Sequence, residues 1–255
     1  MDQALVGFPE FQKKTIKLLE PMLTAARRLT QIGQEIMKVP VSGQFPDLAK
    51  QITRSIANSM ESVLLLVTNG CGIDALRIAR TMFEAAVTLH YLDSHPELVQ
   101  DFVDFMWVIR KKHYEYRLTL PPEKVKPLPP ETLADMESNY KRVEHRFKTR
   151  SGGIRNSWCK ANLKEMAAEV KAESMYGLYP FASSMTHTDI LAVNAGAGGS
   201  EDVEPVPSTA NMTLALQMGV VSFSMALSAF DEIAALRRRN QIDAVFTNFA
   251  AFPVP

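Results

Sequence analysis

The sequence of 255 residues has few cysteines and no excess of charge of either sign. Cys71 and Cys159 are too few for a disulfide scaffold, and no CxxC or Cys/His cluster indicates a structural zinc site. The 28 basic residues balance the 28 acidic ones. Neutrality argues against a dedicated nucleic-acid-binding protein and against a polybasic membrane-surface protein. Since hydrophobic residues make up 46% of the chain, we expect a soluble, cytoplasmic globular protein.

The common motifs of catalysis and nucleotide binding are missing as well. The sequence contains no HExxH, GxxxxGK[ST], GxGxxG or GxSxG. Its five histidines show no paired metal spacing, and His187 and Asp189 would point in different directions on a helix. We therefore expect no metal and no cofactor. The N-terminus has an acid at position 2 and no basic segment before an apolar core, so it does not resemble a secretory signal.

One long uncharged run needs an explanation. The segment from Met212 to Phe230 carries no charge and is close to the roughly 20 residues that span a bilayer. It contains Gln217, Gly219 and three serines, and it continues directly into charged residues. We favour a buried central helix over a membrane span, and we expect no membrane partner.

Helical periodicity runs through nearly the whole sequence, and no strand pattern competes with it. We predict an all-α, single-domain helical bundle of about seven to eight helices. An N-terminal helix and connector occupy residues 1–46, the bundle core 47–240, and an apolar tail 241–255. The proline-rich stretch 121–130 is expected to be an exposed loop. The predicted helices span approximately 9–38, 47–69 with Asp47 as N-cap, 73–92, 96–118, 131–148 (peripheral), 156–172, 176 or 180 to 194, and 208–239.

The predicted helix 73–92 carries the first candidate site. Its apolar residues cover about two-thirds of the circumference, and Arg80 lies at the margin of the polar arc, four residues before Glu84. One interpretation is an ion pair on a solvated face, worth only a few tenths of a kcal/mol. The other is a half-buried ion pair that presents its guanidinium group to a ligand.

The segment that starts at Tyr176 carries the second candidate site. On one helix, Tyr176, Pro180, Ser183 and His187 would fall within about 40°, with Tyr179 about 60° to one side. Hydroxyl groups and an imidazole in one stripe can bind a polar ligand or relay a proton. A hydrogen-bonded structural histidine is the alternative. If Pro180 lies in the first helical turn, Tyr176 leaves the stripe.

These two segments resemble a family of bacterial helical proteins known only as a domain of unknown function, DUF5677. Arg80 and Glu84 match its Arg-x-x-x-Glu helix, and Trp158 matches a Trp-containing element. A Tyr-x-x-Tyr…Ser-x-x-x-His pattern follows, here Tyr176, Tyr179, Ser183 and His187. The similarity spans approximately residues 50–235. It implies a helical fold and the convergence of these side chains, but it gives no activity.

Convergence would assign a role to each of these residues. Arg80 would anchor an anion or a carbonyl group, and Glu84 would orient Arg80. His187 would be the general acid or base, with Glu84 as a further catalytic candidate. The side chains of Tyr176, Tyr179 and Ser183 would contact the ligand. Such a cluster is too polar to be explained by packing, because buried ion pairs stabilise proteins weakly.

Two alternatives belong to other classes. Many small helical bundles resemble HEPN ribonucleases, which use an Arg followed about four to six residues later by a His. This spacing does not occur here, so a ribonuclease would need another constellation. The other alternative is a non-enzymatic interaction module, whose apolar tail with Phe246, Phe249 and Phe252 would contact a partner or a second copy of the chain.

Overall fold

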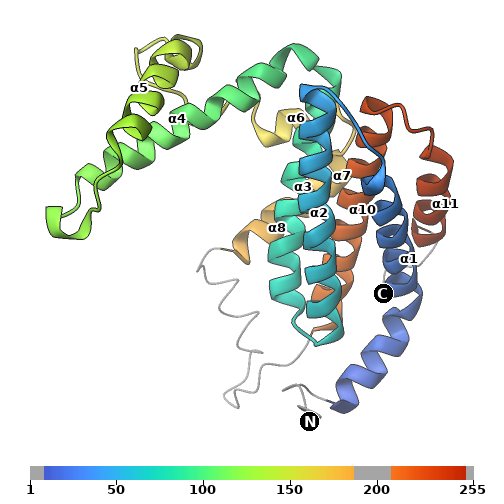
Figure 1. Cartoon of the computed structure of the whole chain (residues 1–255). Coiled ribbons are helices and arrows are strands. Elements are labelled where there is room, and N and C mark those ends of the chain that lie inside the picture. Colours follow the sequence, from blue (N-terminus) through green and yellow to red (C-terminus); the bar gives the residue numbers. More distant parts are fainter. Residues whose placement is uncertain (1–8, 187–207, 251–255) are drawn as a thin grey trace. The chain divides into compact units, whose positions relative to one another are not determined.

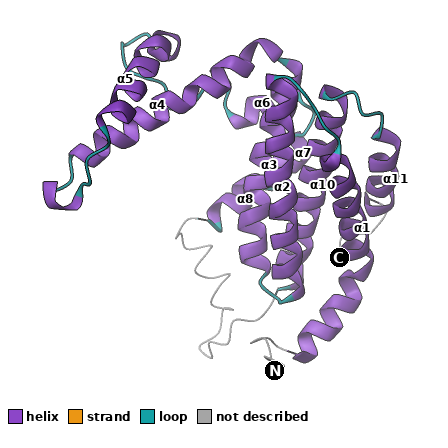
Figure 2. Ribbon diagram, in the orientation of Figure 1, coloured by secondary structure: helices purple, strands orange, loops and turns teal. Residues whose placement is uncertain are grey.

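The computed structural model describes residues 9–186 and 208–250 of the chain. Within these ranges the regular structure is helical, apart from one isolated bridge between Lys148 and Ile154 (Figure 2). Seven α-helices have twelve residues or more, and three are shorter. The all-α prediction is therefore confirmed. The chain divides into two compact units, which we call the bundle unit (residues 1–94 and 163–255) and the insert unit (residues 95–162).

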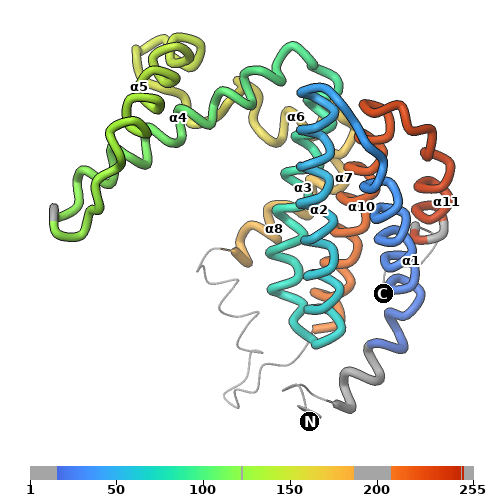
Figure 3. Tube along the Cα trace, viewed as in Figure 1, coloured from blue at the N-terminus to red at the C-terminus, as the bar shows by residue number. Residues whose placement is uncertain are grey.

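Three helices form the core of the bundle unit. α2 (Gln44–Thr68), α3 (Gly72–Ser94) and α10 (Thr209–Ile233) lie side by side (Figures 1 and 3). α10 is apolar on most sides, and side chains such as Phe223 and Phe230 are fully buried. It is the one described helix that is long and apolar enough to cross a membrane, but 78% of its apolar window is buried inside the structure. The uncharged run is thus packed as the predicted central helix.

The start of α2 and the end of α10 differ from the prediction. α2 begins at Gln44, so Asp47 lies in the first turn and Gly43, at a φ of 108°, takes the N-cap position. α10 ends at Ile233 rather than near residue 239. The chain reverses there because Ala235 has a positive φ of 51°, and Asp231 Oδ1 accepts a hydrogen bond from the backbone N–H of Arg238 at 2.7 Å. A separate helix follows.

That helix, α11 (Arg239–Ala250), packs on α1 (Pro9–Lys38) and on α10. The bounds predicted for α1 are confirmed. Much of the apolar tail is buried inside its own chain by this packing, since Ile242, Val245 and Phe249 are at most 5% exposed. Phe252 lies outside the described residues. Contact of the tail with a partner or a second copy stays a prediction.

The insert unit contains α4 (Val99–Leu118) and α5 (Pro130–Val143). Short 3-10 helices precede α4 (Pro96–Leu98) and follow α5 (Glu144–Phe147), and a third (Pro122–Lys124) lies in the predicted proline-rich loop. The predicted helix 131–148 is not peripheral. Its side chains Val143 and Phe147 pack with Phe105 and Val108 of α4 to form the core of this unit.

The predicted helix 156–172 is much shorter in the structure. Within this range only α6 (Leu163–Glu169) is an α-helix. The residues before it make side-chain contacts within the insert unit instead. Lys112 Nζ donates hydrogen bonds to the carbonyl oxygen of Arg155 and to Asn156 Oδ1, and the Trp158 ring packs edge-on against Phe102. Lys171, at a φ of 59°, then interrupts the helical path.

The segment that starts at Tyr176 is also divided. It forms two short helices, α7 (Glu173–Tyr176) and α8 (Tyr179–Ser184), with Gly177 and Leu178 between them. Pro180 lies in the first turn of α8, as expected. The proposed single stripe of side chains therefore does not form within the described residues, because Tyr176 belongs to a separate helix.

Close packing between α3 and α10 gives a first prediction. A Cβ atom on Gly72 would lie 2.8 Å from the backbone N of Met212, whereas one on Gly219 would lie 3.3 Å from a side-chain atom, Met60 Sδ. We expect Gly72→Ala to lower the free energy of unfolding by about 1–3 kcal/mol. For Gly219→Ala, helix propensity offsets the crowding and the change should stay within about 1 kcal/mol. Urea denaturation of both variants measures this, and equal losses would contradict it.

Candidate functional site

The two charged side chains of α3 form the ion pair that their spacing predicts. Arg80 Nη2 lies 2.8 Å from Glu84 Oε1. The Arg80 side chain is only 16% exposed and the Glu84 side chain 37%. Of the two interpretations, the half-buried pair describes the structure, because a fully solvated pair would leave the guanidinium group open to water.

A tyrosine from α8 joins this pair. The Tyr179 hydroxyl accepts a hydrogen bond from Arg80 Nη2 at 2.9 Å and donates one to Glu84 Oε1 at 2.6 Å. The Arg80 guanidinium carbon also lies 5.0 Å from the centroid of the Tyr179 ring, within cation–π range. Three side chains from two helices thus form one closed triad, which we call the Arg80 triad.

The surroundings of the triad shift the acidity of the phenol. Burial raises the pKa of Tyr179, and its hydrogen bond to the Glu84 carboxylate raises the pKa further, because an ionised phenol would lose that bond and face a like charge. The hydroxyl therefore keeps its proton and can act as the donor to Glu84 at neutral pH.

A second arginine of α3 fixes the position of α8. Arg77 Nε donates a hydrogen bond to the carbonyl oxygen of Met185, directly after α8, at 2.5 Å. Arg77 Nη1 also pairs with Asp74 at 2.7 Å. The ring of Phe83 lies 6.2 Å from that of Tyr179. Contacts at both ends of this short helix hold Tyr179 over α3.

The remaining predicted site residues have different outcomes. Tyr176 stacks on Tyr179, with ring centroids 5.4 Å apart and an angle of 14° between the planes. Ser183 is half-buried on α8, and its side chain makes no hydrogen bond to Arg80, Glu84 or Tyr179. His187 and Asp189 lie outside the described residues. Trp158 packs in the insert unit. No group of acidic, histidine or cysteine side chains suited to a metal ion occurs among the described residues.

One atom of the triad is left without a partner. Arg80 Nε is buried and has no hydrogen-bond acceptor in the part of the chain that the structure describes. Both polar contacts of Arg80 within the triad use the same nitrogen, Nη2. A buried donor without an acceptor costs about 1–3 kcal/mol. The guanidinium group therefore retains unused hydrogen-bonding capacity.

A protein-family model matches residues 47–202, which is more than half of the chain, and it describes a family of unknown function, DUF5677. The chain belongs to the DUF5677 family. The matched segment contains all three side chains of the Arg80 triad as well as the insert unit. No curated protein matches this DUF5677 chain, and no solved structure matches it.

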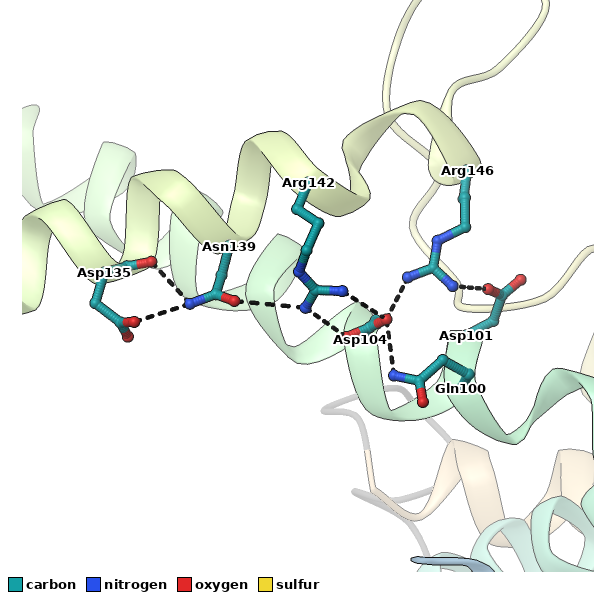
Figure 4. Close-up of polar contacts among 7 residues, drawn as sticks. All are labelled: Gln100, Asp101, Asp104, Asp135, Asn139, Arg142 and Arg146. Carbon is teal, nitrogen blue, oxygen red and sulfur yellow. Dashed lines mark hydrogen bonds and ion pairs between the residues drawn. The ribbon is translucent and has the colours of Figure 1, made fainter.

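A second polar cluster of this DUF5677 protein lies in the insert unit. The Asp104 carboxylate on α4 is 3% exposed. It accepts hydrogen bonds from Arg142 Nη2 at 3.0 Å, from Gln100 Nε2 at 2.9 Å and from Arg146 Nη2 (Figure 4). Arg146 Nη1 also donates to Asp101 at 2.6 Å. We call this group the Asp104 cluster.

The sequence contains one signal that could have revealed the Asp104 cluster. Both Arg142 and Arg146 contact the insert unit's buried carboxylate. Asp104 lies beside Phe105 and four residues before Val108, on the apolar face of α4. An acid at such a position needs cationic partners, and two arginines four residues apart on a neighbouring segment supply them.

Opposing effects determine the acidity of Asp104. Burial would raise its pKa, but the hydrogen bonds from Arg142, Gln100 and Arg146 outweigh burial and hold the pKa below its ordinary value of 3.8. Asp104 therefore stays ionised in the folded chain at pH values where the unfolded chain already binds a proton. Its contribution to stability is present above about pH 3.8 and is lost as the pH falls through the lower, folded-state pKa.

We predict that Tyr179→Phe destabilises the bundle unit by about 1–2 kcal/mol, because the variant loses a hydroxyl that bonds two charged groups. Tyr176→Phe is the matched control: it retains the stacked ring and should change the free energy of unfolding by no more than about 0.5 kcal/mol. Urea denaturation followed by circular dichroism compares the two. Equal effects would show that the bridging hydroxyl of Tyr179 contributes nothing.

For the insert unit we predict that Asp104→Asn costs about 1–3 kcal/mol at pH 7, since its arginine partners lose a buried carboxylate. Exposed Asp135, which bonds Asn139 (Figure 4), provides the control variant Asp135→Asn. Between pH 5 and 3 the wild type should lose stability more steeply than Asp104→Asn, because only the wild type carries the lowered pKa. Parallel pH profiles in urea denaturation would rule out this role of Asp104.

Proposed function

We propose that the Arg80 triad binds a small ligand through a carboxylate or carbonyl oxygen. The observation that carries this proposal is the buried Nε–H of Arg80, which has no acceptor among the described residues. An oxygen atom of a ligand would satisfy this donor. Because the guanidinium group is planar and held through Nη2, its Nε–H has a fixed direction and can donate to one oxygen of a carboxylate or carbonyl group.

Glu84 and Tyr179 have a positioning role in this proposal. Both bind Nη2 of Arg80, at 2.8 Å and 2.9 Å, which fixes the plane of the guanidinium group. Glu84 also balances its charge, so a neutral carbonyl compound can bind as well as an anion. Preorganisation of this kind reduces the side-chain entropy that binding would otherwise cost.

A purely structural role explains the triad less well. Buried ion pairs contribute little to stability relative to apolar residues of the same size, and this one leaves a donor unsatisfied. The stacked rings of Tyr176 and Tyr179 add a flat aromatic surface beside the charges. Guanidinium, carboxylate and aromatic groups in one place are typical of small-molecule sites.

The other predicted residues extend the proposal. Ser183, half-buried on α8, and Tyr176 are proposed as further ligand contacts. His187 is proposed as a general acid or base at the same site, with Glu84 as the second candidate. The family that contains this chain carries no assigned activity, so we propose ligand binding as the function and no particular reaction.

The test uses three aromatic probes of equal size and different charge: benzoate, benzamide and benzylamine. We expect benzoate and benzamide to bind the wild-type chain in an NMR titration, and benzylamine, which has no acceptor oxygen, not to bind. Arg80→Lys keeps the positive charge but removes Nε, so it should weaken benzoate binding at least tenfold, equal to about 1.4 kcal/mol.

The matched control is Arg27→Lys, because Arg27 forms an ion pair with Glu20 at 3.1 Å on exposed α1. This variant should bind benzoate like the wild type. Tyr179→Phe provides a second variant should Arg80→Lys fail to fold, and it too should weaken binding. Unchanged affinity in folded Arg80→Lys, or equal binding of benzylamine, would refute the proposal.

A further inference from the structure

A cavity of about 370 Å³ lies elsewhere in the bundle unit, away from the Arg80 triad. Its walls come from the end of α3, the connection between α6 and α7 together with α7, one face of α10, and α11. These helices are labelled in Figure 1. None of the three triad residues lines it. Small-molecule sites in proteins have volumes of about 300–1,000 Å³. The cavity is thus large enough for a metabolite-sized molecule.

The α10 wall of the cavity carries a buried hydroxyl group without a partner. Ser224 is 6% exposed, and its Oγ has no hydrogen-bond partner in the described ranges. Ser228, one turn later on α10 and 5% exposed, lines the same wall. Buried polar groups are nearly always satisfied, so an unsatisfied hydroxyl in a cavity wall indicates a place for a polar atom of a ligand.

A histidine on the α3 wall is fixed in one neutral form. His90 Nε2 lies 2.9 Å from the carbonyl oxygen of Met225, which can only accept, so Nε2 carries the proton and Nδ1 is an acceptor. Burial lowers the pKa of His90, and its hydrogen bond to Met225 only partly offsets this effect. At neutral pH the imidazole therefore adds no charge to the wall.

Charged side chains of both signs lie around the cavity. Arg239 contacts two carboxylates, Glu232 at 3.0 Å and, through Nε at 2.9 Å, Asp243, so these three side chains together carry one negative charge. Lys171, which also lines the cavity, makes no ion pair with a described residue. Its positive φ of 59° places this lysine at the break after α6. An anionic group would complement the Lys171 ammonium group.

Apolar side chains form most of the rest of the lining. Met175 and Met225 face the cavity together with Val221 and Phe246. Methionine side chains adapt to ligands of irregular shape. A ligand that fits this lining has an apolar body and one charged end.

We propose that this cavity is a second binding site, which takes a small amphipathic monocarboxylate. The carboxylate would pair with Lys171, the apolar body would pack on Met175, Val221 and Phe246, and a polar atom of the ligand would satisfy Ser224. This site is separate from the Arg80 triad, so each proposal can fail without the other.

Octanoate, octanol and octylamine test the proposal, because they share an apolar body and differ in charge. In NMR titrations of the full chain with labelled methionine methyl groups, we expect octanoate to shift the signals of Met175 and Met225. The signal of Met136, buried in the insert unit, should not move. Octanol should bind at least fivefold more weakly than octanoate, and octylamine should not bind.

Two substitutions, with one control, test which side chains contribute to octanoate binding. Lys171→Asn removes the charge and tolerates a positive φ, so the affinity for octanoate should fall to that for octanol. Lys164→Asn, on the exposed surface of α6, is the matched control and should bind octanoate like the wild type. Val221→Trp narrows the cavity and should weaken binding of both compounds.

Several results would overturn this second site. One is the absence of octanoate binding to the folded wild type, and another is a shift of the Met136 signal as strong as that of Met175. Octylamine could bind as tightly as octanoate. Lys171→Asn could leave octanoate affinity unchanged, a result that is decisive even when Val221→Trp fails to fold, because Lys171 is an exposed residue.

Discussion

The bundle unit depends on the burial of α10 between its neighbours. α10 has no charged residue until Asp231, and almost every side of it is covered by α2, α3, α1 or α11. Gly72 permits the backbones of α3 and α10 to approach closely, since even a Cβ atom there would meet the backbone of Met212 at 2.8 Å. Once α3 is held in this way, only a narrow part of its surface is left for polar residues. Arg80 and Glu84, one turn apart, lie on that part of α3.

The sequence was sufficient to predict the helical fold, the bounds of α1 and the buried character of α10, because these depend on periodicity over many residues. It failed where a single side-chain contact outside the helical repeat decided the local structure. Just after the end of α10, Asp231 accepts a hydrogen bond from the backbone N–H of Arg238. Lys112 donates hydrogen bonds to residues 155 and 156, which are not helical. Neither contact leaves a periodic signal. The division between α7 and α8, which separates Tyr176 from the helix that carries Tyr179, did leave a signal, because Pro180 lies in the first turn of α8.

The candidate site shows the same division between local and long-range information. The Arg80–Glu84 pair could be predicted, since both residues lie on one helix at a spacing that brings them together. The participation of Tyr179, almost a hundred residues later, was implied by the family resemblance alone. Its bridging hydroxyl could not be predicted from spacing, because the stripe that we expected on one helix placed Tyr179 to one side. The cavity beside His90 had no signal at all, as its walls come from four separate segments.

The two buried charge clusters of this protein differ in a way that separates a structural role from a binding role. In the Asp104 cluster the carboxylate accepts hydrogen bonds from three side chains, and those partners hold it ionised. The Asp104 carboxylate is thus already bonded within the protein. Its hydrogen bonds join α4 to the segment that carries Arg142 and Arg146. In the Arg80 triad both polar contacts use one nitrogen, and a buried N–H has no acceptor among the described residues. A cluster whose only role was to stabilise the fold would be more stable if that donor had an acceptor. The unused donor is therefore the physical reason to look for a ligand at Arg80 rather than at Asp104.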